Sequence, residues 1–459
     1  MSGNWIKIAI LFCLVFPARA QPDPCRIEIV DAENGWPVPL VELRTNHHQR
    51  FVTDNAGVIA LDAPELMGRE TFFHVEGHGY TVPADGFGYR GVRLTPEPGQ
   101  TLRIEVERTI IAKRLGRLTG TGLFAESQQL GDYDDWRDGP TVGQDTVQLA
   151  RYNDQLFWLW GDTTLYDYPL GVFHSSAATT GLEPFNDFRP PIEPTFDYFT
   201  QPNTDRPRGV ARLPGDGPTW IGGMTALPDA HGRERLVATY AKISGFVHAY
   251  EHGLCVWNDA TQSFERTRVL WNESTGEDRP AVLPDGHPFR YTDPDGNDWL
   301  LFGNPLPTLR CEASFEAWQD PDQWQPLDAP RVLRSPDGQE VVPHTGSVCF
   351  NPYRNKWVTV FMQRFGQPSA FGELWYAEAD SPLGPWGPCI KILSHNNYTF
   401  YNPRIHPELT ADDDTFLVFE GTYTTFFADD PEPTPRYDYN QLLYRLDLDD
   451  PQLVPARGE

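Results

Sequence analysis

Two aspartates, Asp145 and Asp162, are the side chains of this sequence best spaced for acid–base chemistry. Residues 146–152 alternate between polar and apolar and residues 156–160 form an apolar run, which predicts two antiparallel strands. A loop centred on the turn signal Asn153-Asp154 places Asp145 directly opposite Asp162. Opposite residues of an antiparallel pair share a face, with Cβ atoms ~5 Å apart. Two carboxylates this close cannot both ionise easily, so one can act as a general acid while the other remains a base or nucleophile.

The structural alternative is that both aspartates are turn residues at strand ends, a role that Gly161-Asp162-Thr163 would suit in particular. If the pair is catalytic, Asp162 is the better acid, because the neighbouring Trp160 reduces its hydration. A separation of ~5 Å between the two carboxyl groups predicts retention of configuration. A separation of ~7 Å or more admits water and predicts inversion.

The same kind of hairpin recurs along the chain and predicts the architecture that would position this pair. Each further unit has a polar or Gly-containing start, a short strand, a turn and an apolar strand, at residues 219–241, 287–304, 344–363 and 402–421. With residues 141–164 they make five units at intervals of roughly 55 to 75 residues, which predicts an all-β, five-bladed β-propeller over residues 111–459. The strand-like run at residues 441–447 is expected to pair near residues 116–124 and to close the ring. A pair of β-sandwiches is the alternative fold, but it does not explain the fivefold recurrence.

Two separate parts are predicted before the propeller. Residues 1–20 have the pattern of a signal peptide, with Lys7, an apolar run at residues 8–16 and a cleavage site at Ala18-Arg19-Ala20. This run is too short to span a bilayer and nothing later resembles a transmembrane segment, so we expect a secreted or periplasmic protein. Residues 21–110 contain strand-like runs separated by Gly-, Asn- and Pro-containing turns, which predicts a small β-sandwich domain.

Net charge and cysteine content limit the kinds of molecule that this protein is expected to bind. The net charge of −27 disfavours nucleic acid and anionic membranes, because both would repel such a surface. Five cysteines follow the predicted cleavage site, far apart and without metal-site spacing, and we expect a monomer in which at least one of them is unpaired. One or two disulfides would be compatible with an oxidising compartment, but their pairing cannot be derived from the sequence.

Short motifs give residues 114–448 a resemblance to known enzymes. Residues 376–393, YAEADSPLGPWGPCIKIL, resemble the fourth-blade stretch of five-bladed glycoside hydrolases related to family 43. QDTVQ followed by WGDT resembles a bacterial group labelled as a domain of unknown function and related to arabinan-cleaving enzymes. The resemblance implies acid-catalysed attack on a glycosidic bond, with Asp145 and Asp162 matching that group's two first-blade aspartates. Enzymes of family 43 instead take one carboxylate from each of three blades, for which Glu251 and Glu312 are the nearest candidates.

The N-terminal domain has a resemblance of its own. GWPVPLVEL, FVTDNAGVIAL and GHGY, within residues 35–80, resemble carboxypeptidase-regulatory-like or transthyretin-like accessory domains. Such a resemblance implies a domain that orients or tethers its partner domain and carries no chemistry.

Polar groups at the ends of the inner strands of a propeller converge on one site. This rule gives candidate substrate-binding residues beside the aspartate pair: Tyr240, Lys242, Arg290, His344, Asn402, Arg404, His406 and Glu420. A sugar would also need aromatic platforms, for which Trp158, Trp160 and Tyr401 are candidates. Arg404 is expected directly opposite Glu420, where a structural ion pair is the alternative to sugar binding. No metal ligands are predicted and no cofactor is required. The acidic run at residues 411–414 is most simply a solvated turn, although its oxygens would suit calcium.

Three functions remain open at this stage. The first is an exported hydrolase of arabinan or another glycan, and the second is a non-catalytic propeller that binds carbohydrate or protein. The pair of facing acids favours the hydrolase over the binding propeller, because a binding module gains nothing from two carboxylates that repel each other. The third is a polysaccharide lyase, which would need Arg290 and Arg404 to form a local basic channel for a polyanion.

Overall fold

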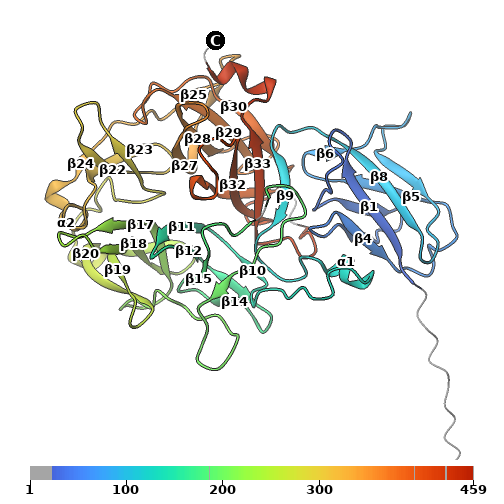
Figure 1. Ribbon diagram of the computed structural model, residues 1–459, viewed down its shortest axis with the longest axis horizontal. Helices are drawn as coiled ribbons and strands as arrows, with labels where there is room; N and C mark the ends of the chain where they lie inside the picture. Colours follow the sequence, from blue (N-terminus) through green and yellow to red (C-terminus); the bar gives the residue numbers. More distant parts are fainter. Residues whose placement is uncertain (1–22, 186, 397, 429–431, 458–459) are drawn as a thin grey trace, which may run out of the picture.

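The computed structural model describes residues 23–185, 187–396, 398–428 and 432–457, and almost all of their regular structure is β. A small β part and a larger ring of sheets lie side by side in Figure 1, coloured blue and cyan-to-red respectively. The predicted signal peptide, residues 1–20, lies outside the described residues. Among the described helices, none is long and apolar enough to cross a membrane.

The N-terminal part is a sandwich of two four-stranded sheets, as the alternating runs predicted. One sheet has the order β4-β1-β8-β6 and the other β3-β2-β5-β7. The strands are β1 Cys25–Asp31, β2 Glu42–Thr45, β3 Arg50–Val52, β4 Val58–Leu61, β5 Thr71–Glu76, β6 Tyr80–Thr81, β7 Gly91–Leu94 and β8 Thr101–Arg108. Apolar side chains from both sheets, among them Ile27, Leu43 and Phe73, form one buried core between them.

The ring consists of five four-stranded antiparallel sheets, which confirms the predicted all-β propeller fold. Blade 1 consists of β11 Val147–Tyr152, β12 Gln155–Trp160, β15 Ser176–Thr180 and β16 Asp197–Tyr198. Blade 2 consists of β17 Thr219–Pro228, β18 Glu234–Ser244, β19 His248–Asn258 and β20 Ser263–Asn272. Blade 3 consists of β21 Phe289–Thr292, β22 Asp298–Gly303, β23 Pro307–Glu312 and β24 Gln325–Pro326. Blade 4 consists of β27 Pro343–Asn351, β28 Lys356–Gln363, β29 Glu373–Ala379 and β30 Ile390–Ser394. Blade 5 consists of β31 Thr399–Ile405, β32 Phe416–Thr424, β33 Asn440–Asp447 and β9 Lys113–Arg117.

Shorter elements decorate the blades. A three-stranded sheet of β10 Gly143–Gln144, β13 Thr163–Leu165 and β14 Tyr168–Val172 extends the hairpin of blade 1, and β25 Leu333–Arg334 pairs with β26 Glu340–Val341. The helices are short: α1 Ala125–Gln129, α2 Phe315–Gln319 and the 3-10 turns η1 Glu273–Thr275, η2 Pro321–Gln323, η3 Pro407–Leu409 and η4 Pro451–Arg457.

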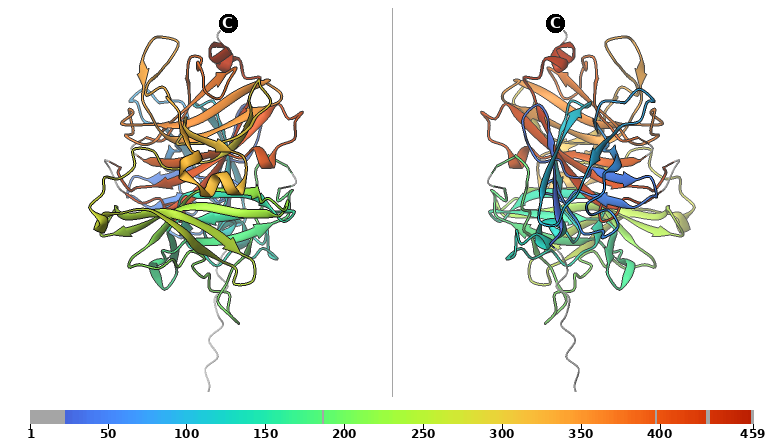
Figure 2. Two further views of the ribbon diagram at one scale, coloured as in Figure 1. Left: turned by 90° about the vertical axis from the view of Figure 1, so that its left-hand side faces the viewer. Right: turned by 90° about the vertical axis from the view of Figure 1, so that its right-hand side faces the viewer.

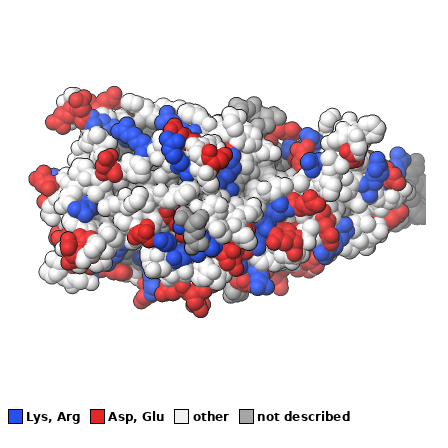
Figure 3. Space-filling view, turned by 90° about the horizontal axis from the view of Figure 1, so that it is seen from above, with Lys and Arg blue, Asp and Glu red and all other residues white. Residues whose placement is uncertain are grey.

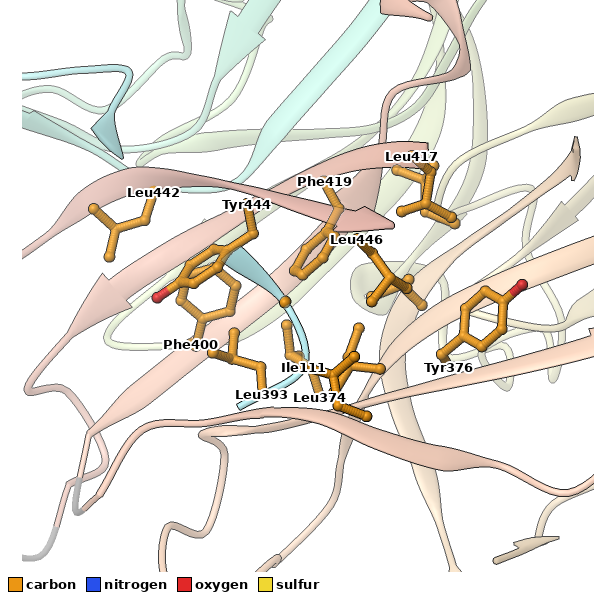
Figure 4. Packing of buried hydrophobic residues seen from close by; sticks show 14 of the residues in the cluster. Ile111, Leu374, Tyr376, Leu393, Phe400, Leu417, Phe419, Leu442, Tyr444 and Leu446 are labelled. Carbon is orange, nitrogen blue, oxygen red and sulfur yellow. The ribbon is translucent and has the colours of Figure 1, made fainter. Parts of the chain in front are cut away.

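The apolar strands pack between consecutive blades, which is what holds the ring together. Separate buried clusters join blades 1 and 2, blades 2 and 3, and blades 3 and 4. The largest joins blades 4 and 5, and Figure 4 shows Leu374 and Leu393 of blade 4 facing Phe400 and Phe419 of blade 5. Ile111, which directly follows the sandwich, enters the same cluster. Burial of this kind is the main favourable term for folding.

A strand from before blade 1 completes blade 5, so the ring closes as predicted. β33 pairs antiparallel with β9, with Leu442 opposite Arg117 and Leu443 opposite Gly116. The strand that pairs is residues 113–117 and not 116–124. In that later stretch Gly120 and Gly122 have positive φ and α1 begins at Ala125, so the chain leaves the sheet. Closure gives blade 5 its fourth strand and provides hydrogen-bond partners for the backbone groups at the edge of β33.

Buried arginines fix the sandwich to the ring. Arg114 on β9 is 1% exposed and donates to the Pro39 carbonyl oxygen (2.9 Å) and the Tyr444 hydroxyl (2.9 Å). Asn55 of the sandwich accepts from the backbone N–H of Arg117 (2.9 Å) and donates to its carbonyl oxygen (3.0 Å). In the right-hand view of Figure 2 the sandwich, coloured blue, lies in front of the ring. Loss of either domain would remove these hydrogen-bond partners from the other.

The five described cysteines, Cys25, Cys255, Cys311, Cys349 and Cys389, are all buried and free. Each lies in an apolar cluster or a strand core, so they act as small apolar residues here. Charged residues of both signs are mixed over the face shown in Figure 3, with no continuous basic surface.

Candidate active site

A cavity of about 1410 Å³ opens on the ring and is lined by blades 1, 2, 3 and 5. Its wall includes Asp145 and Asp162 with their neighbours, strand β14, strands β17 and β18, and the segment of residues 279–287 that precedes blade 3. Three of its described lining residues carry carboxylates, namely Asp145, Asp162 and Asp285. The volume exceeds the ~300–1,000 Å³ that is usual for a small-molecule site, so a ligand longer than one sugar unit fits.

The predicted register of the blade 1 hairpin is confirmed. Val147 lies opposite Trp160 in the blade, and Gln144 lies opposite Thr163 in the small sheet beyond it. The two sheets meet at Asp145 and Asp162, where the Asp145 N–H donates to the Asp162 carbonyl oxygen (3.2 Å). The aspartates therefore occupy the bend of the hairpin and both border the cavity.

Glycine is required at this bend. A Cβ at Gly161 would collide with Asp145 Oδ1, so the absence of a side chain there lets the carboxylate approach the opposite strand. The adjacent Thr146 has φ of 46°, a conformation that costs energy for a β-branched residue. Asn402 of blade 5 holds Thr146 in place through a hydrogen bond from its Nδ2 to Thr146 Oγ1 (2.7 Å).

Asp145 is surrounded by donors. Its Oδ1 accepts from the Asp162 backbone N–H (2.7 Å) and its Oδ2 accepts from the Tyr401 hydroxyl (2.7 Å). Burial raises the pKa of Asp145, and hydrogen bonds from Tyr401, Tyr439 and the Asp162 amide oppose that rise. Donors stabilise the ionised form, which favours a base or nucleophile at this position.

Asp162 is in the opposite situation. Its Oδ1 is buried and has no hydrogen-bond partner among the described residues. Burial, followed by repulsion from Asp145, raises the pKa of Asp162 to about 7, and only the Trp220 side chain acts in the other direction. A carboxyl group with a pKa near neutrality holds a proton that it can donate at physiological pH.

Two of the predicted substrate-binding residues border the cavity. Asn402 is one, with φ of 50° and the contact to Thr146 already described. Tyr240 is the other, although its hydroxyl points away and donates to Glu251 Oε1 (2.7 Å). The side chain is only 2% exposed, so Tyr240 supports the cavity wall.

Four other predicted residues lie away from the cavity. Trp160 is fully buried and stacks between Trp158 and Tyr198 in the blade core. Lys242 is also fully buried and its Nζ donates to the Gly217 carbonyl oxygen (2.9 Å) and Thr219 Oγ1 (3.1 Å). Arg290 is exposed on β21, and His344 packs against Phe371, and neither borders the cavity.

The blade 5 polar cluster is structural. Arg404 lies directly opposite Glu420, as predicted, but its guanidinium pairs with Glu408 Oε1 (2.6 Å). His406 Nε2 lies 2.7 Å from Glu420 Oε1, and both side chains are fully buried. Burial raises the pKa of Glu420 to about 8 and lowers that of His406, which favours a neutral pair. None of the three borders the cavity, so the structure does not bring them together with the aspartate pair.

The carboxylates proposed from family 43 lie outside the cavity. Glu251 accepts from Tyr240, Arg266 (3.0 Å) and Asn272 (2.8 Å), and Glu312 is exposed at the end of β23. Asp285 borders the cavity as a third carboxylate, and a Cβ at Gly222 would collide with its Oδ1. Asp285 precedes the third hairpin in the sequence much as Asp145 precedes the first, and this offset is the signal that could have found it.

Sequence reasoning also missed Trp220 and Tyr439, which contact the pair from blade 2 and from the segment before β33. Nothing local in the sequence marks them, because both reach the pair only through the tertiary fold. Arg279 is the one Lys or Arg that borders the cavity among the described residues, so the basic channel that a lyase would need is not formed. In the described part of the chain, no group of three His, Cys, Asp or Glu is arranged to hold a metal ion.

Comparison with known proteins adds a distant likeness. No protein-family model matches the sequence, and no curated protein does so either. An exo-1,5-α-L-arabinanase from a bovine ruminal metagenomic library has a TM-score of 0.37 and 12% identity, covering 67% of this chain and 94% of the other. An α-L-arabinanase mutant from Cellvibrio cellulosa has a TM-score of 0.38 and 12% identity, with coverage of 67% and 92%. A Bacteroides ovatus protein described only as a hydrolase has a TM-score of 0.43 and 14% identity, with coverage of 67% and 86%. At such TM-scores the assignment of function depends on the site itself.

Proposed function

We propose that the protein is an exported glycoside hydrolase in which Asp162 is the general acid and Asp145 the base or nucleophile. The observation that carries the proposal is the asymmetry of the pair. Asp145 accepts hydrogen bonds from Tyr401 and the Asp162 amide, whereas Asp162 Oδ1 has no partner among the described residues and its pKa is raised to about 7. Two carboxyl groups whose environments separate their pKa values are the usual equipment for acid-catalysed glycoside cleavage.

Each residue has a defined part in the proposed reaction. Asp162 gives its proton to the leaving glycosidic oxygen as the bond to the anomeric carbon breaks. Asp145 either attacks that carbon or takes a proton from the water that does so. Tyr401 and Tyr439 keep Asp145 ionised and oriented, so they are positioning residues.

The substrate class that suits the cavity is a neutral glycan, of which arabinan is the first candidate. Aromatic side chains from several blades border the cavity, including Trp220, Tyr240 and Tyr401. Such rings present flat apolar faces to a sugar, and polar groups among them orient it. Export is supported by the sequence of residues 1–20 alone.

The experiment is a hydrolysis screen of the purified protein against arabinans, xylans and fucose-rich algal glycans, followed by Asp145→Asn and Asp162→Asn on a responsive glycan. Asn keeps the shape of the side chain and removes its acid–base chemistry, so each variant should lose about 10²-fold or more in kcat. Asp154→Asn, in the exposed turn of the same hairpin, is the matched control and should retain full activity.

Two results would count against the assignment. Near wild-type rates in both Asn variants would mean that the pair is structural, and Asp285 would be the next carboxylate to replace. Tight glycan binding with no hydrolysis by the wild-type protein would instead favour a non-catalytic binding propeller.

A further inference from the structure

Exposed apolar side chains gather at the mouth of the candidate site. We call this set the apolar rim, and its members are Tyr168 (63% exposed), Leu170 (36%), Phe173 (40%), Phe246 (73%), Val247 (58%), Phe426 (47%) and Phe427 (59%). They come from three separate segments: β14 and its end, the turn between β18 and β19, and the chain after β32. Single exposed apolar residues are ordinary on a protein surface, but seven around one cavity are not.

The rim is built at a conformational cost. Leu170 has φ of 52° and Phe427 has φ of 63°, a left-handed conformation that bulky side chains rarely adopt. Gly or Asn at either position would relieve the strain and remove the apolar surface. Strain of this kind concentrates at ligand-binding sites, where it holds a side chain in a required place.

A direct packing contact joins the rim to the aspartate pair. The Phe426 ring packs edge-on against Tyr439, with ring centroids 5.6 Å apart. Tyr439 in turn borders the cavity together with Asp145 and acts against the rise in the pKa of Asp145. A group that lies on the rim is therefore one side chain away from the carboxylate that would act on the glycosidic bond.

The chemistry of the rim indicates what it contacts. Of the seven rim side chains, only Tyr168 carries a polar atom that could bond a hydroxyl group. Leu170 and Val247 also have no ring that could stack on a sugar. The three rim segments contain no Lys or Arg, so they offer no counter-charge to an anionic group. The neighbouring Asp167 is paired with Arg206 at 2.6 Å.

We propose that the apolar rim binds an apolar substituent, an acyl chain or an aryl group, that the glycan carries next to the bond that is cleaved. This inference rests on the proposed function of the aspartate pair and extends it to the identity of the substrate. The substituent lies across Phe246, Val247 and Phe427 while the sugar lies against Trp220 and Tyr401 deeper in the cavity. The aliphatic and Phe side chains exclude water from it, which is the source of the affinity.

The test compares the binding of methyl and octyl α-L-arabinofuranoside, below the micelle concentration of the latter, by titration calorimetry. The full-length protein carries Asp162→Asn, which slows turnover so that binding can be measured. Octyl should bind about tenfold or more tightly than methyl, a ratio that burial of about two methylene groups provides. Phe246→Ser with Phe427→Ser should abolish the difference, and Phe87→Ser, a fully exposed Phe of the sandwich, should preserve it.

Equal affinities for the two glycosides, or an octyl preference that survives in the double rim variant, would overturn the proposal. Rim-dependent sedimentation with phosphatidylcholine vesicles, without an octyl preference, would assign the surface to a membrane and overturn it as well. The comparison measures binding and not hydrolysis, so it separates the two proposals. A rim-dependent octyl preference in a protein whose wild type cleaves no glycan would leave the rim assigned and the catalytic proposal refuted.

Discussion

Replacement of Asp162 by Asn should stabilise the protein, and the gain should depend on pH. Burial and the neighbouring Asp145 raise the pKa of Asp162 from 3.8 to about 7 in the folded protein. The folded state therefore holds this proton more tightly than the unfolded chain, and stability falls as pH rises through the window from about 4 to about 7. Asn never ionises, so the variant escapes that loss.

The magnitude follows from the two pKa values. A difference of about three pKa units corresponds to about 4 kcal/mol, since each unit is about 1.4 kcal/mol. Asp162 is partly exposed to the cavity, so solvent screening reduces this to about 2 kcal/mol. In thermal unfolding the variant and wild type should melt together at pH 4, and at pH 8 the variant should melt a few degrees higher.

Asp145→Asn provides the matched comparison. An amide at position 145 would direct its NH₂ group at the Tyr401 hydroxyl or the Asp162 N–H, which are donors in the wild type. We therefore expect a smaller gain or a loss from Asp145→Asn at pH 8. A melting difference between Asp162→Asn and wild type that stays constant from pH 4 to pH 8 would refute the assignment of a raised pKa to Asp162.

Two further predictions address the support of the site and of the ring. Tyr401→Phe removes a donor to Asp145, so the pKa of Asp145 should rise further and the acid limb of the pH–rate profile should move to higher pH with it. An unchanged acid limb would exclude Tyr401 as a positioning residue. Leu443→Ala should destabilise the protein by about 2–5 kcal/mol, because Leu443 of β33 is fully buried against Leu115 and Val418 where the ring closes. Val332→Ala, at an exposed apolar position, should change the melting temperature by less than a degree, and an equally small effect of Leu443→Ala would contradict the closure argument.

Local patterns were sufficient for the strand pairings of the propeller. Asn153-Asp154 fixed the centre of the blade 1 hairpin, and from it the position of Asp145 opposite Asp162 followed. The loop at residues 410–414 did the same for Arg404 and Glu420. Both results depend only on the two-residue period of a strand and the place of a turn, which nearby residues determine. The partner of β33 was predicted a few residues too late, because the end of β9 is decided by contacts with the sandwich.

Nearby residues do not determine how deep a side chain lies along the channel, and most of the predicted substrate-binding residues lie away from the cavity. Lys242 and Asn402 both lie on inner-blade segments with polar side chains near a strand end, yet Lys242 is buried under the Gly217 carbonyl oxygen and Asn402 borders the cavity. Whether such a side chain reaches the cavity depends on the segments that pack over it, as Leu213, Gly217 and Thr219 do over Lys242. The asymmetry of the aspartate pair has the same origin. Asp145 and Asp162 are equivalent by register, but Tyr401 and Tyr439 arrive from blade 5 on the side of Asp145 alone. An acid and a base thus become distinct only after the last blade has closed against the first.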